Sequence, residues 1–299
     1  LAIKQTLYRV SSSSPFVQAL EKAVQNGKQV TVLMEVKARF DEANNILMAR
    51  RLEKAGAHVI YGLVGLKTHS KCTLVIRREK DGIRRYVHVA TGNYNASTAK
   101  LYTDLGILTC NDRFGIDASA FFNLLSGYSD PPIWDSFIVA PINLRQRCIE
   151  LIDREIHFAK NGEDAHMIAK MNSLLDKGII EKLYEASQAG VKIELIVRGI
   201  CVLIPGIPGV SDNITVRSIV GRFLEHSRIF WFRNGGREEL YISSADWMPR
   251  NLNDRVELMV PIEDPEIKRR LKQMVDIELS DNQKAHIMQA DGTCLLYTS

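Results

Sequence analysis

Long hydrophobic runs are missing from this 299-residue sequence, and cysteine is scarce. No stretch approaches the roughly 18 to 20 consecutive apolar residues that a membrane-spanning helix requires, so no transmembrane segment is expected. The five cysteines are widely spaced, odd in number and without a Cys-x-x-Cys pair. This pattern argues against a disulfide framework or a zinc site and favours a reducing, cytoplasmic setting. The first ten residues lack the apolar core of a signal peptide, and we expect the sequence to begin inside a longer polypeptide.

Charge of one sign is not in large excess either. Lysine and arginine number 39 against 35 aspartates and glutamates, a net charge of +4. This excess is too small to predict nucleic-acid binding, but it allows local cationic sites for anionic substrates. The composition, 45% hydrophobic and 25% charged, is that of a globular protein and excludes a disordered or collagen-like chain. At about 150 residues per domain, the length favours two domains.

Helices and strands alternate in the first half of the sequence. Ser14 and Pro15 form a typical helix start, and Gly27 follows the last apolar residue of the same helical face. The run 29–36 is almost continuously apolar and β-branched, as in a strand buried on both faces. The other elements expected here are a helix at 41–56 and strands at 58–63, 71–78 and 86–92, the last two joined by a turn at Lys80-Asp81-Gly82.

The segment 128–141 has no helical period and contains Pro131-Pro132, so we expect a domain boundary there, with domains at 1–136 and 137–293. Residues 294–299 resemble a translated sequencing adapter, and we interpret them as a non-native tail. The elements expected in the second domain are helices at 142–160 and 172–189, strands at 191–198, 214–220, 227–232 and 239–246, a Gly/Pro loop at 204–210, and a closing helix from Asp264.

The two halves repeat the same series of features. Each has a buried strand ending in a basic segment, and 30 residues after Arg39 or 28 after Arg198 a His-x-basic tripeptide follows. These tripeptides are His69-Ser70-Lys71 and His226-Ser227-Arg228. Each leads into a strand, a turn, a second strand and a small polar cluster. The series predicts an internal duplication, hence an α/β (α+β) protein of two similar domains, each with a mixed β-sheet flanked by helices.

The paired tripeptides carry the chemistry that the sequence suggests. Residues i and i+2 of a strand share a face, so His69 and Lys71 should lie together, and a neighbouring ammonium favours a neutral, nucleophilic imidazole. Such a histidine facing a phosphorus atom fits covalent phosphohistidine chemistry, and His226 could supply an acid from the other half. A single histidine is more often a surface or satisfied core residue, and we interpret His58, His88, His157, His166 and His286 in that way.

Arginines supply cationic partners for phosphate. Arg39 and Arg198 end the two equivalent buried strands, which makes them the stronger candidates. Taken singly, Arg9, Arg217 and Arg222 are better explained as solvated surface charges, although all three lie near the motifs.

The motifs resemble those of a known superfamily. His69-Ser70-Lys71 and the Gly92-Asn93-Tyr94-Asn95 segment are similar to the two parts of a phospholipase D-type motif. That motif also has an aspartate five residues after the lysine, where this sequence has Ile76 in the first half and Arg233 in the second. The loss of both acids argues against phosphodiester hydrolysis.

A fuller resemblance is to the long-form polyphosphate kinase family, over about residues 1 to 290. The similar segments include LYRVSSSSPFVQAL, MEVKARFDEANN, LKTHSK, TGNYN, LYTDLG, GRFLEHSRI and YISSADWMPRN. The resemblance implies two C-terminal, phospholipase D-like catalytic domains, with an N-terminal and a helical domain upstream in a full-length parent.

The resemblance also implies roles for individual residues. His69 matches the phosphorylated histidine and His226 the second active-site histidine, and Lys71 would bind phosphate and tune His69. Tyr102, Arg198 and His226 match ATP-contacting positions. Arg9 and Arg39 match a magnesium-phosphate site, where we interpret them as phosphate ligands beside a Mg²⁺ held by phosphate oxygens. The supporting residues would be Asn93, Asn95, Arg222 and Arg228.

The expected function is therefore reversible transfer of the ATP γ-phosphate to inorganic polyphosphate through phosphohistidine, with Mg²⁺ as cofactor. The expected ligands are ATP, ADP and polyphosphate, with no nucleic acid, and the full-length parent is expected to be a homo-oligomer, cytoplasmic or peripheral to a membrane. Two alternatives stay open: a phospholipase D-type phosphodiesterase or nuclease, and a non-catalytic fragment that binds polyphosphate or nucleotide.

Overall fold

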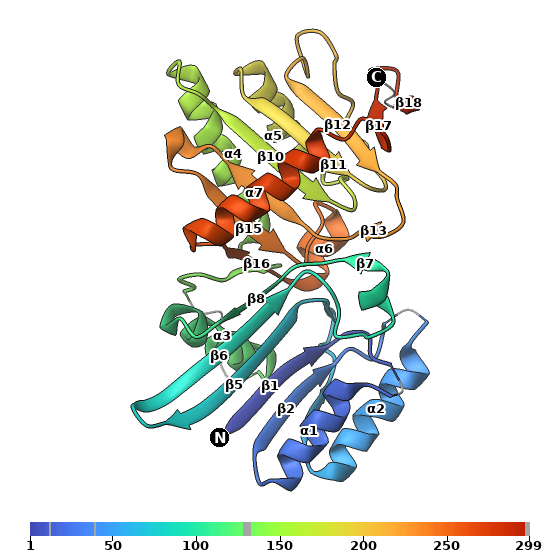
Figure 1. Cartoon of the computed structure of the whole chain (residues 1–299), viewed down its shortest axis with the longest axis vertical. Coiled ribbons are helices and arrows are strands. Elements are labelled where there is room, and N and C mark those ends of the chain that lie inside the picture. Colours follow the sequence, from blue (N-terminus) through green and yellow to red (C-terminus); the bar gives the residue numbers. More distant parts are fainter. Residues whose placement is uncertain (12, 39, 128–132, 297–299) are drawn as a thin grey trace.

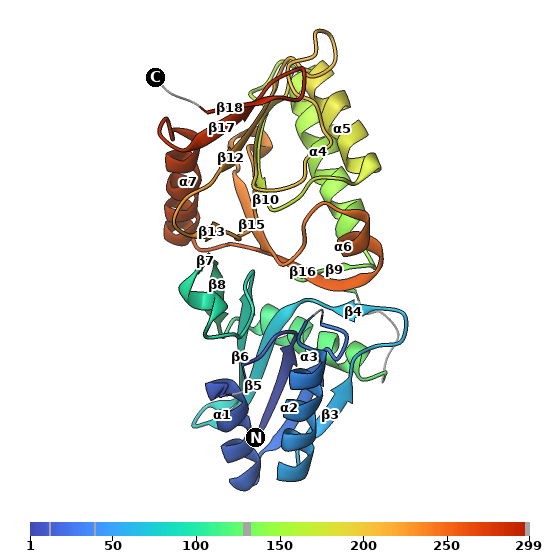
Figure 2. The same ribbon diagram turned by 90° about the vertical axis from the view of Figure 1, so that its right-hand side faces the viewer.

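The computed structural model describes residues 1–11, 13–38, 40–127 and 133–296, which form two halves stacked along the long axis (Figure 1). Each half is built around its own β-sheet, with helices on both faces (Figure 2). None of the helices in these residues combines the length and hydrophobicity that a bilayer crossing requires.

The first sheet has six strands in the order β3-β2-β1-β5-β6-β8. Strands β1, β2 and β3 are parallel because helices connect them, and β5, β6 and β8 continue the sheet as antiparallel neighbours. The strands expected at 29–36, 58–63 and 71–78 are confirmed, while β6 begins four residues earlier than expected. The bounds are Ala2–Leu7 (β1), Gln29–Met34 (β2), His58–Tyr61 (β3), Lys71–Glu79 (β5), Gly82–Ala90 (β6) and Gly106–Thr109 (β8).

Helix ends in the first half follow the local sequence. Ser14 Oγ accepts a hydrogen bond from the N–H of Val17, and Pro15 is the first residue of α1, as predicted. Gly56 ends α2 with a φ of +101°, which favours glycine. Helix α3 was not predicted, and it packs on the sheet face opposite α1 and α2. The bounds are Pro15–Gln25 (α1), Glu42–Ala55 (α2), Asp112–Leu125 (α3) and Thr98–Lys100 (η1, a 3-10 helix).

The second sheet contains the series β12-β11-β10-β14-β15-β16. Its first three strands are parallel and the others antiparallel, so strand order and direction repeat those of the first sheet. The predicted duplication and fold class are thus confirmed. The bounds are Ile138–Ala140 (β9), His166–Met171 (β10), Lys192–Val197 (β11), Ile214–Ile219 (β12), Ile229–Phe232 (β14), Glu239–Ser243 (β15), Arg255–Pro261 (β16), Ala285–Met288 (β17) and Cys294–Leu296 (β18).

One predicted helix of the second half is wrong at its start. The helix expected at 172–189 begins only after Asp176, whose side chain accepts a hydrogen bond from the N–H of Ile179. The preceding residues 166–171 form the central strand β10, which was missed because the charged Lys170 interrupts a short apolar run. The bounds are Leu144–Lys160 (α4), Lys177–Gln188 (α5), Asn234–Gly236 (η2, a 3-10 helix), Pro249–Asn253 (α6) and Pro265–Leu279 (α7).

Two short parallel ladders join the halves. Strand β4 (Lys67–Thr68) of the first half pairs with β16 of the second, and β13 (Leu224–Glu225) of the second pairs with β7 (Tyr102–Thr103) of the first. Both views show β7 beside β13 at the junction (Figures 1 and 2). Each ladder ends one residue before a histidine of a His-x-basic tripeptide, so the exchange places both histidines between the sheets.

Two sequence expectations concern the domain boundary and the C-terminal segment. The Pro131-Pro132 pair of the expected boundary lies outside the described residues. Residues 294–296 form β18 and pair with β17, so half of the segment interpreted as a tail takes part in the second sheet.

Candidate active site

His69 is held by a carboxylate from the other half of the molecule. It follows β4 directly, and its Nδ1 lies 2.9 Å from both carboxylate oxygens of Glu257 on β16. The edge of the Tyr8 ring closes another side, with ring centroids 4.9 Å apart. Since Glu257 can only accept when ionised, this contact favours the tautomer with hydrogen on Nδ1 and leaves the Nε2 lone pair for chemistry.

His226 has the equivalent arrangement, with the roles of the two halves exchanged. It follows β13, and its Nδ1 lies 2.7 Å from Oδ1 of Asp104, which belongs to the first half. Asp104 and Glu257 are equivalent residues. Gly106 pairs with Ala90 in the first sheet as Met259 pairs with Ser243 in the second, and each acid lies two residues before the first residue of such a pair, Gly106 or Met259. Each histidine therefore takes its carboxylate from the opposite domain.

Matching hydroxyls hold both carboxylates in place. Thr91 Oγ1 donates to Asp104 at 2.6 Å and accepts from the N–H of Leu105, and Ser244 Oγ donates to Glu257 at 2.5 Å and accepts from the N–H of Leu258. Thr91 and Ser244 belong to the small polar clusters that end the repeated series in each half of the sequence. These clusters act on the histidines indirectly, because their hydroxyls fix the carboxylates that hold the imidazole rings.

The surroundings of both imidazoles lower their pKa and so favour the neutral form. Burial, followed by the charges of Lys71, Arg255 and Arg228, holds the pKa of His69 well below its usual value. Burial and the neighbouring Arg228 lower the pKa of His226 to about 4. The sequence argument named Lys71 as the cause for His69, but desolvation is the larger effect.

The two histidines differ in the side chains beside the ring. Arg228 Nη1 lies over the face of the His226 ring, 3.1 Å from Nε2 and 3.3 Å from Nδ1, and donates to the His226 carbonyl oxygen at 2.7 Å. The Arg228 guanidinium also forms an ion pair with Asp246, 3.1 Å from Nε to Oδ1. At the equivalent positions of the first half, Lys71 Nζ and Asn93 Oδ1 are buried and have no hydrogen-bond partner among the described residues. The Nδ1 of His69 is held by Glu257 and its ring lines the cavity with no cation from the described residues against it, whereas a guanidinium lies against the ring of His226.

Lys71 is a buried ammonium without a hydrogen-bond partner among the described residues. Burial lowers the pKa of its ammonium to about 7, against the opposing effect of Glu257, and its Nζ lies 5.7 Å from the centroid of the Tyr8 ring. A phosphate beside Lys71 would restore its full charge, because an opposite charge favours the ionised form.

A cavity of about 250 Å³ lies between the two histidines. Its lining is strongly cationic, with five arginines and one aspartate, and that aspartate is paired with Arg228. A small, positive space suits phosphoryl groups. The lining residues are Tyr8, Arg9, His69, Asn93, Tyr102, Asn172, Ser173, Arg198, Leu224, His226, Arg228, Asp246, Arg250 and Arg255.

Most of the predicted site residues meet at this cavity. The Tyr102 ring lies 4.9 Å from that of His226, Arg198 Nε donates to Asn172 at 2.8 Å, and Arg9 lies beside Asp41 at 2.5 Å. Three candidates do not line it. Lys71 is absent from the lining, although its charge acts on His69. Arg222 is exposed and stacks on Phe223, and the side chain of Asn95 caps the loop by accepting from the N–H groups of Ser97 and Thr98. Arg39 lies outside the described residues.

Sequence reasoning missed several residues of the site. Glu257 interrupts an apolar strand, and a carboxylate in such a place needs a buried partner, which is the one signal that could have found it. Asp104, Tyr8, Arg250 and Arg255 gave no comparable signal, since they come from short or irregular segments.

The comparison with known proteins agrees with this geometry. The family model for polyphosphate kinase C-terminal domain 1 matches residues 1–131, and that for C-terminal domain 2 matches residues 137–298. The chain belongs to the polyphosphate kinase family.

Its relatives are considerably longer than the chain itself. A polyphosphate kinase of Halalkalibacterium halodurans is 61% identical over 95% of the chain, and one of Thermosynechococcus vestitus is 59% identical over 98%. In both cases the chain spans only 40% of the relative. The crystal structure of a polyphosphate kinase from Porphyromonas gingivalis matches the whole chain with a TM-score of 0.92 and 40% identity, over 46% of its own length.

The fold is shared more widely. A phosphatidylserine synthase from Haemophilus influenzae matches 96% of the chain, and 82% of its own length, with a TM-score of 0.62 and 10% identity. At that identity the match concerns the two-domain fold alone.

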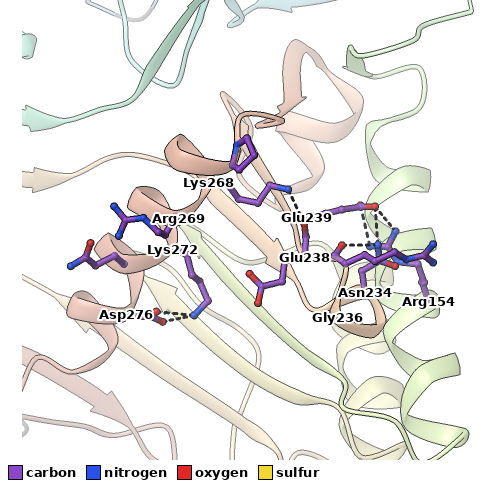
Figure 3. Close-up of a pocket in the computed structure, with 12 residues that line it drawn as sticks. Arg154, Asn234, Gly236, Glu238, Glu239, Lys268, Arg269, Lys272 and Asp276 are labelled. Carbon is purple, nitrogen blue, oxygen red and sulfur yellow. Dashed lines mark hydrogen bonds and ion pairs between the residues drawn. The ribbon is translucent and has the colours of Figure 1, made fainter.

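A second, larger cavity of about 1030 Å³ lies far from the histidines, between α4, η2 and α7 (Figure 3). Its charged side chains largely neutralise one another: Arg154 lies 3.0 Å from Glu239, and Lys272 lies 2.6 Å from Asp276. This cavity is therefore the larger of the two, but its cations are paired and do not converge on one point as those of the smaller cavity do.

Proposed function

We propose that the chain forms the catalytic part of a polyphosphate kinase, which transfers the γ-phosphate of ATP reversibly to inorganic polyphosphate through a phosphohistidine at His69. The observation that carries this proposal is the asymmetry between the two histidines. His69 combines a carboxylate on Nδ1 with a ring that lines a cationic cavity, while the Arg228 guanidinium lies against the ring of His226 and disfavours the positive charge that a phosphorylated imidazole would carry.

In the first step, Nε2 of His69 attacks the γ-phosphorus of ATP. A nitrogen–phosphorus bond forms, the bond from the γ-phosphorus to the bridging oxygen breaks, and ADP leaves with that electron pair. Glu257 stabilises the positive charge that develops on the imidazole ring, because its carboxylate accepts from Nδ1.

In the second step, the terminal oxygen of a polyphosphate chain attacks the phosphorus on His69. The nitrogen–phosphorus bond breaks, and the imidazole is regenerated in its neutral form. His226 and Arg228 assist at the oxygen that gains or loses the phosphoryl group, since both line the cavity. One phosphoanhydride replaces another, so the reaction should also run towards ATP.

Cationic side chains replace water around the transferred group. The ammonium of Lys71 has no partner among the described residues and would donate to a phosphoryl oxygen beside His69, the amide nitrogen of Asn93 would donate to another, and arginines from both halves surround the cavity. Their charge offsets the negative charge on the equatorial oxygens in the transition state.

The expected Mg²⁺ is proposed as a companion of the substrate. Among the described residues no three His, Cys, Asp or Glu side chains converge to hold a metal, and the acids near the cavity are engaged by His69, His226 and Arg228. The chain thus supplies phosphate ligands, and the phosphate oxygens of ATP would hold the cation.

The test is to incubate the full-length protein with γ-labelled ATP and map the label. We expect acid-labile phosphate on His69, loss of label in His69→Ala, and retention of label in His88→Ala, a half-buried histidine outside the cavity. Label that survives His69→Ala refutes the assignment. A coupled assay for ATP formation from ADP and polyphosphate separates the proposal from its rivals: hydrolysis of a diester without nucleotide would favour a phosphodiesterase, and binding without turnover a non-catalytic module.

A further inference from the structure

The two sheets differ in how their equivalent faces are covered. In the second half α4 and α5 share one face and α7 covers the other (Figure 2). In the first half α1 corresponds to α5 and α3 to α7, since they follow equivalent strands. Among the described residues α4 has no counterpart there. Figure 1 shows α1 and α2 beside β1 and β2, with the β5–β6 hairpin extending away from them.

In the second half α4 covers the β14–β15 hairpin. Its Glu155 accepts from the N–H of Asn234 at 2.8 Å, its Arg154 pairs with Glu239, and its Cys148 lies against Trp247. Beneath it the face is apolar and fully buried, with the Phe230 and Trp247 rings stacked 4.8 Å apart.

The same positions in the first half form an open pocket of about 590 Å³. Apolar side chains at its rim are exposed, 81% for Leu108 and 38% for Phe16. The strand registers give the equivalent pairs, first half then second: Gln5 and Ala169, Thr73 and Phe230, His88 and Tyr241. Tyr94 and Trp247 are also equivalent, since each lies four residues after the end of its strand, β6 or β15.

Polar groups in the floor of this pocket point to a covering segment. Tyr94 Oη links Thr73 Oγ1 and His88 Nδ1, each at 2.8 Å. The amide Nε2 of Gln5 is buried and has no partner among the described residues. A covering segment that carries an acceptor over Gln5 would satisfy this nitrogen, and its apolar side chains would cover the rim.

We infer that an amphipathic helix, supplied by the polypeptide directly preceding β1 in the full-length protein, docks on this face as α4 docks on the second half. Three observations support that occupant. Helix α4 directly precedes β10, with five residues between them, and β10 is equivalent to β1. The matching family models are C-terminal domains. The relatives are about two and a half times as long as the chain.

The inference is tested by thiol labelling at the rim of the pocket, which does not depend on the proposed catalytic step. Leu108→Cys is labelled with a maleimide in this 299-residue chain, in the same chain extended by the 30 upstream residues of its own gene, and in the full-length protein. Ile277→Cys, 63% exposed on α7, is the matched control. Peptide mass spectrometry reads each position separately from the native cysteines.

We expect the 30-residue extension to slow labelling at position 108 at least tenfold and to leave position 277 unchanged. Equal reactivity at position 108 with and without the extension overturns the inference, even where the full-length protein is protected, because another domain then covers the face. Protection in the 299-residue chain that grows with protein concentration also overturns it, in favour of a second copy. As an independent measurement, Leu108→Asp should lower the melting temperature of the extended chain but not that of the 299-residue chain.

Discussion

Replacing Glu257 with glutamine removes one charge at the centre of the proposed reaction and leaves the shape of the side chain intact. The carboxylate accepts from His69, from Ser244 and from Asn251 Nδ2 at 2.6 Å. Glutamine can keep its oxygen towards His69 and Asn251 and place its amide nitrogen near Ser244, whose hydroxyl can accept. The tautomer of His69 is therefore retained, and what is lost is the negative charge beside a ring that becomes positive.

The magnitude follows from the distance. Two unit charges 2.9 Å apart interact by about 6 kcal/mol at an effective dielectric constant of about 20, which sets an upper limit. Exchanging a charge-assisted hydrogen bond for a neutral one costs at least about 1 kcal/mol. A loss of about 2–4 kcal/mol lies between these bounds and corresponds to a roughly 30- to 1,000-fold slower phosphorylation of His69.

The assay is single-turnover labelling of the full-length protein with γ-labelled ATP. Asp104→Asn is the matched control, because it removes the equivalent charge beside His226. We expect Glu257→Gln to slow formation of the labelled histidine, and Asp104→Asn to leave formation near normal and slow the transfer to polyphosphate. Wild-type labelling rates in a folded Glu257→Gln protein would refute the reasoning. Equal effects of both variants on the first step would show that the two histidines do not have separate roles.

Three further predictions follow from the same site. The pKa of His226 is about 4 in the folded protein and about 6.5 in the unfolded chain. Its contribution to the free energy of unfolding, about 3 kcal/mol, is therefore fully present above about pH 6.5 and is lost as the pH drops towards 4. In urea unfolding across this range, the stability of His226→Gln should depend less steeply on pH than that of the wild type. The pKa of Lys71 is lowered to about 7, so its ammonium loses its proton as the pH rises from 7 to 9 and nucleotide binding by the free protein should weaken. Lys71→Arg should flatten this pH profile in a binding titration. An unchanged profile counts against the role of Lys71. A methyl group on Gly92 would overlap with the Asp104 carboxylate, so Gly92→Ala should lower turnover at least tenfold. Gly178→Ala should leave turnover unchanged, because a methyl group there would make only an ordinary contact, 3.5 Å from Asp176 Oδ1.

The sequence predicted the parts of this protein that depend on local pattern. The strand at 29–36 was evident because both of its faces are buried, and α1 because Ser14 and Pro15 define its start. The duplication was evident because both His-x-basic tripeptides keep their place in the series of elements. These features are encoded by neighbouring residues, and neighbouring residues are what a single sequence displays.

The rest depends on contacts between distant residues. Glu257 lies 188 residues from His69, and Asp104 lies 122 residues from His226, so spacing in the sequence gives no hint that they meet. The exchange of short strands between the halves creates both contacts, and β4 and β13 have only two residues each. Strands that short show no period of their own. The helix expected at 172–189 failed for a related reason, since only tertiary burial identifies 166–171 as a strand.

The duplicated scaffold explains why two nearly identical histidine sites can differ in chemistry. Backbone register, acid and supporting hydroxyl are equivalent in the two halves, so they cannot distinguish the histidines. The difference lies in one pair of side chains: lysine and asparagine in the first half, Lys71 and Asn93, and arginine and aspartate in the second, Arg228 and Asp246. The arginine pairs with its aspartate and lies against the imidazole, whereas the lysine and asparagine keep unfilled hydrogen-bonding capacity beside His69. Reversing this pair should therefore move nucleophilic character between histidines without altering the fold.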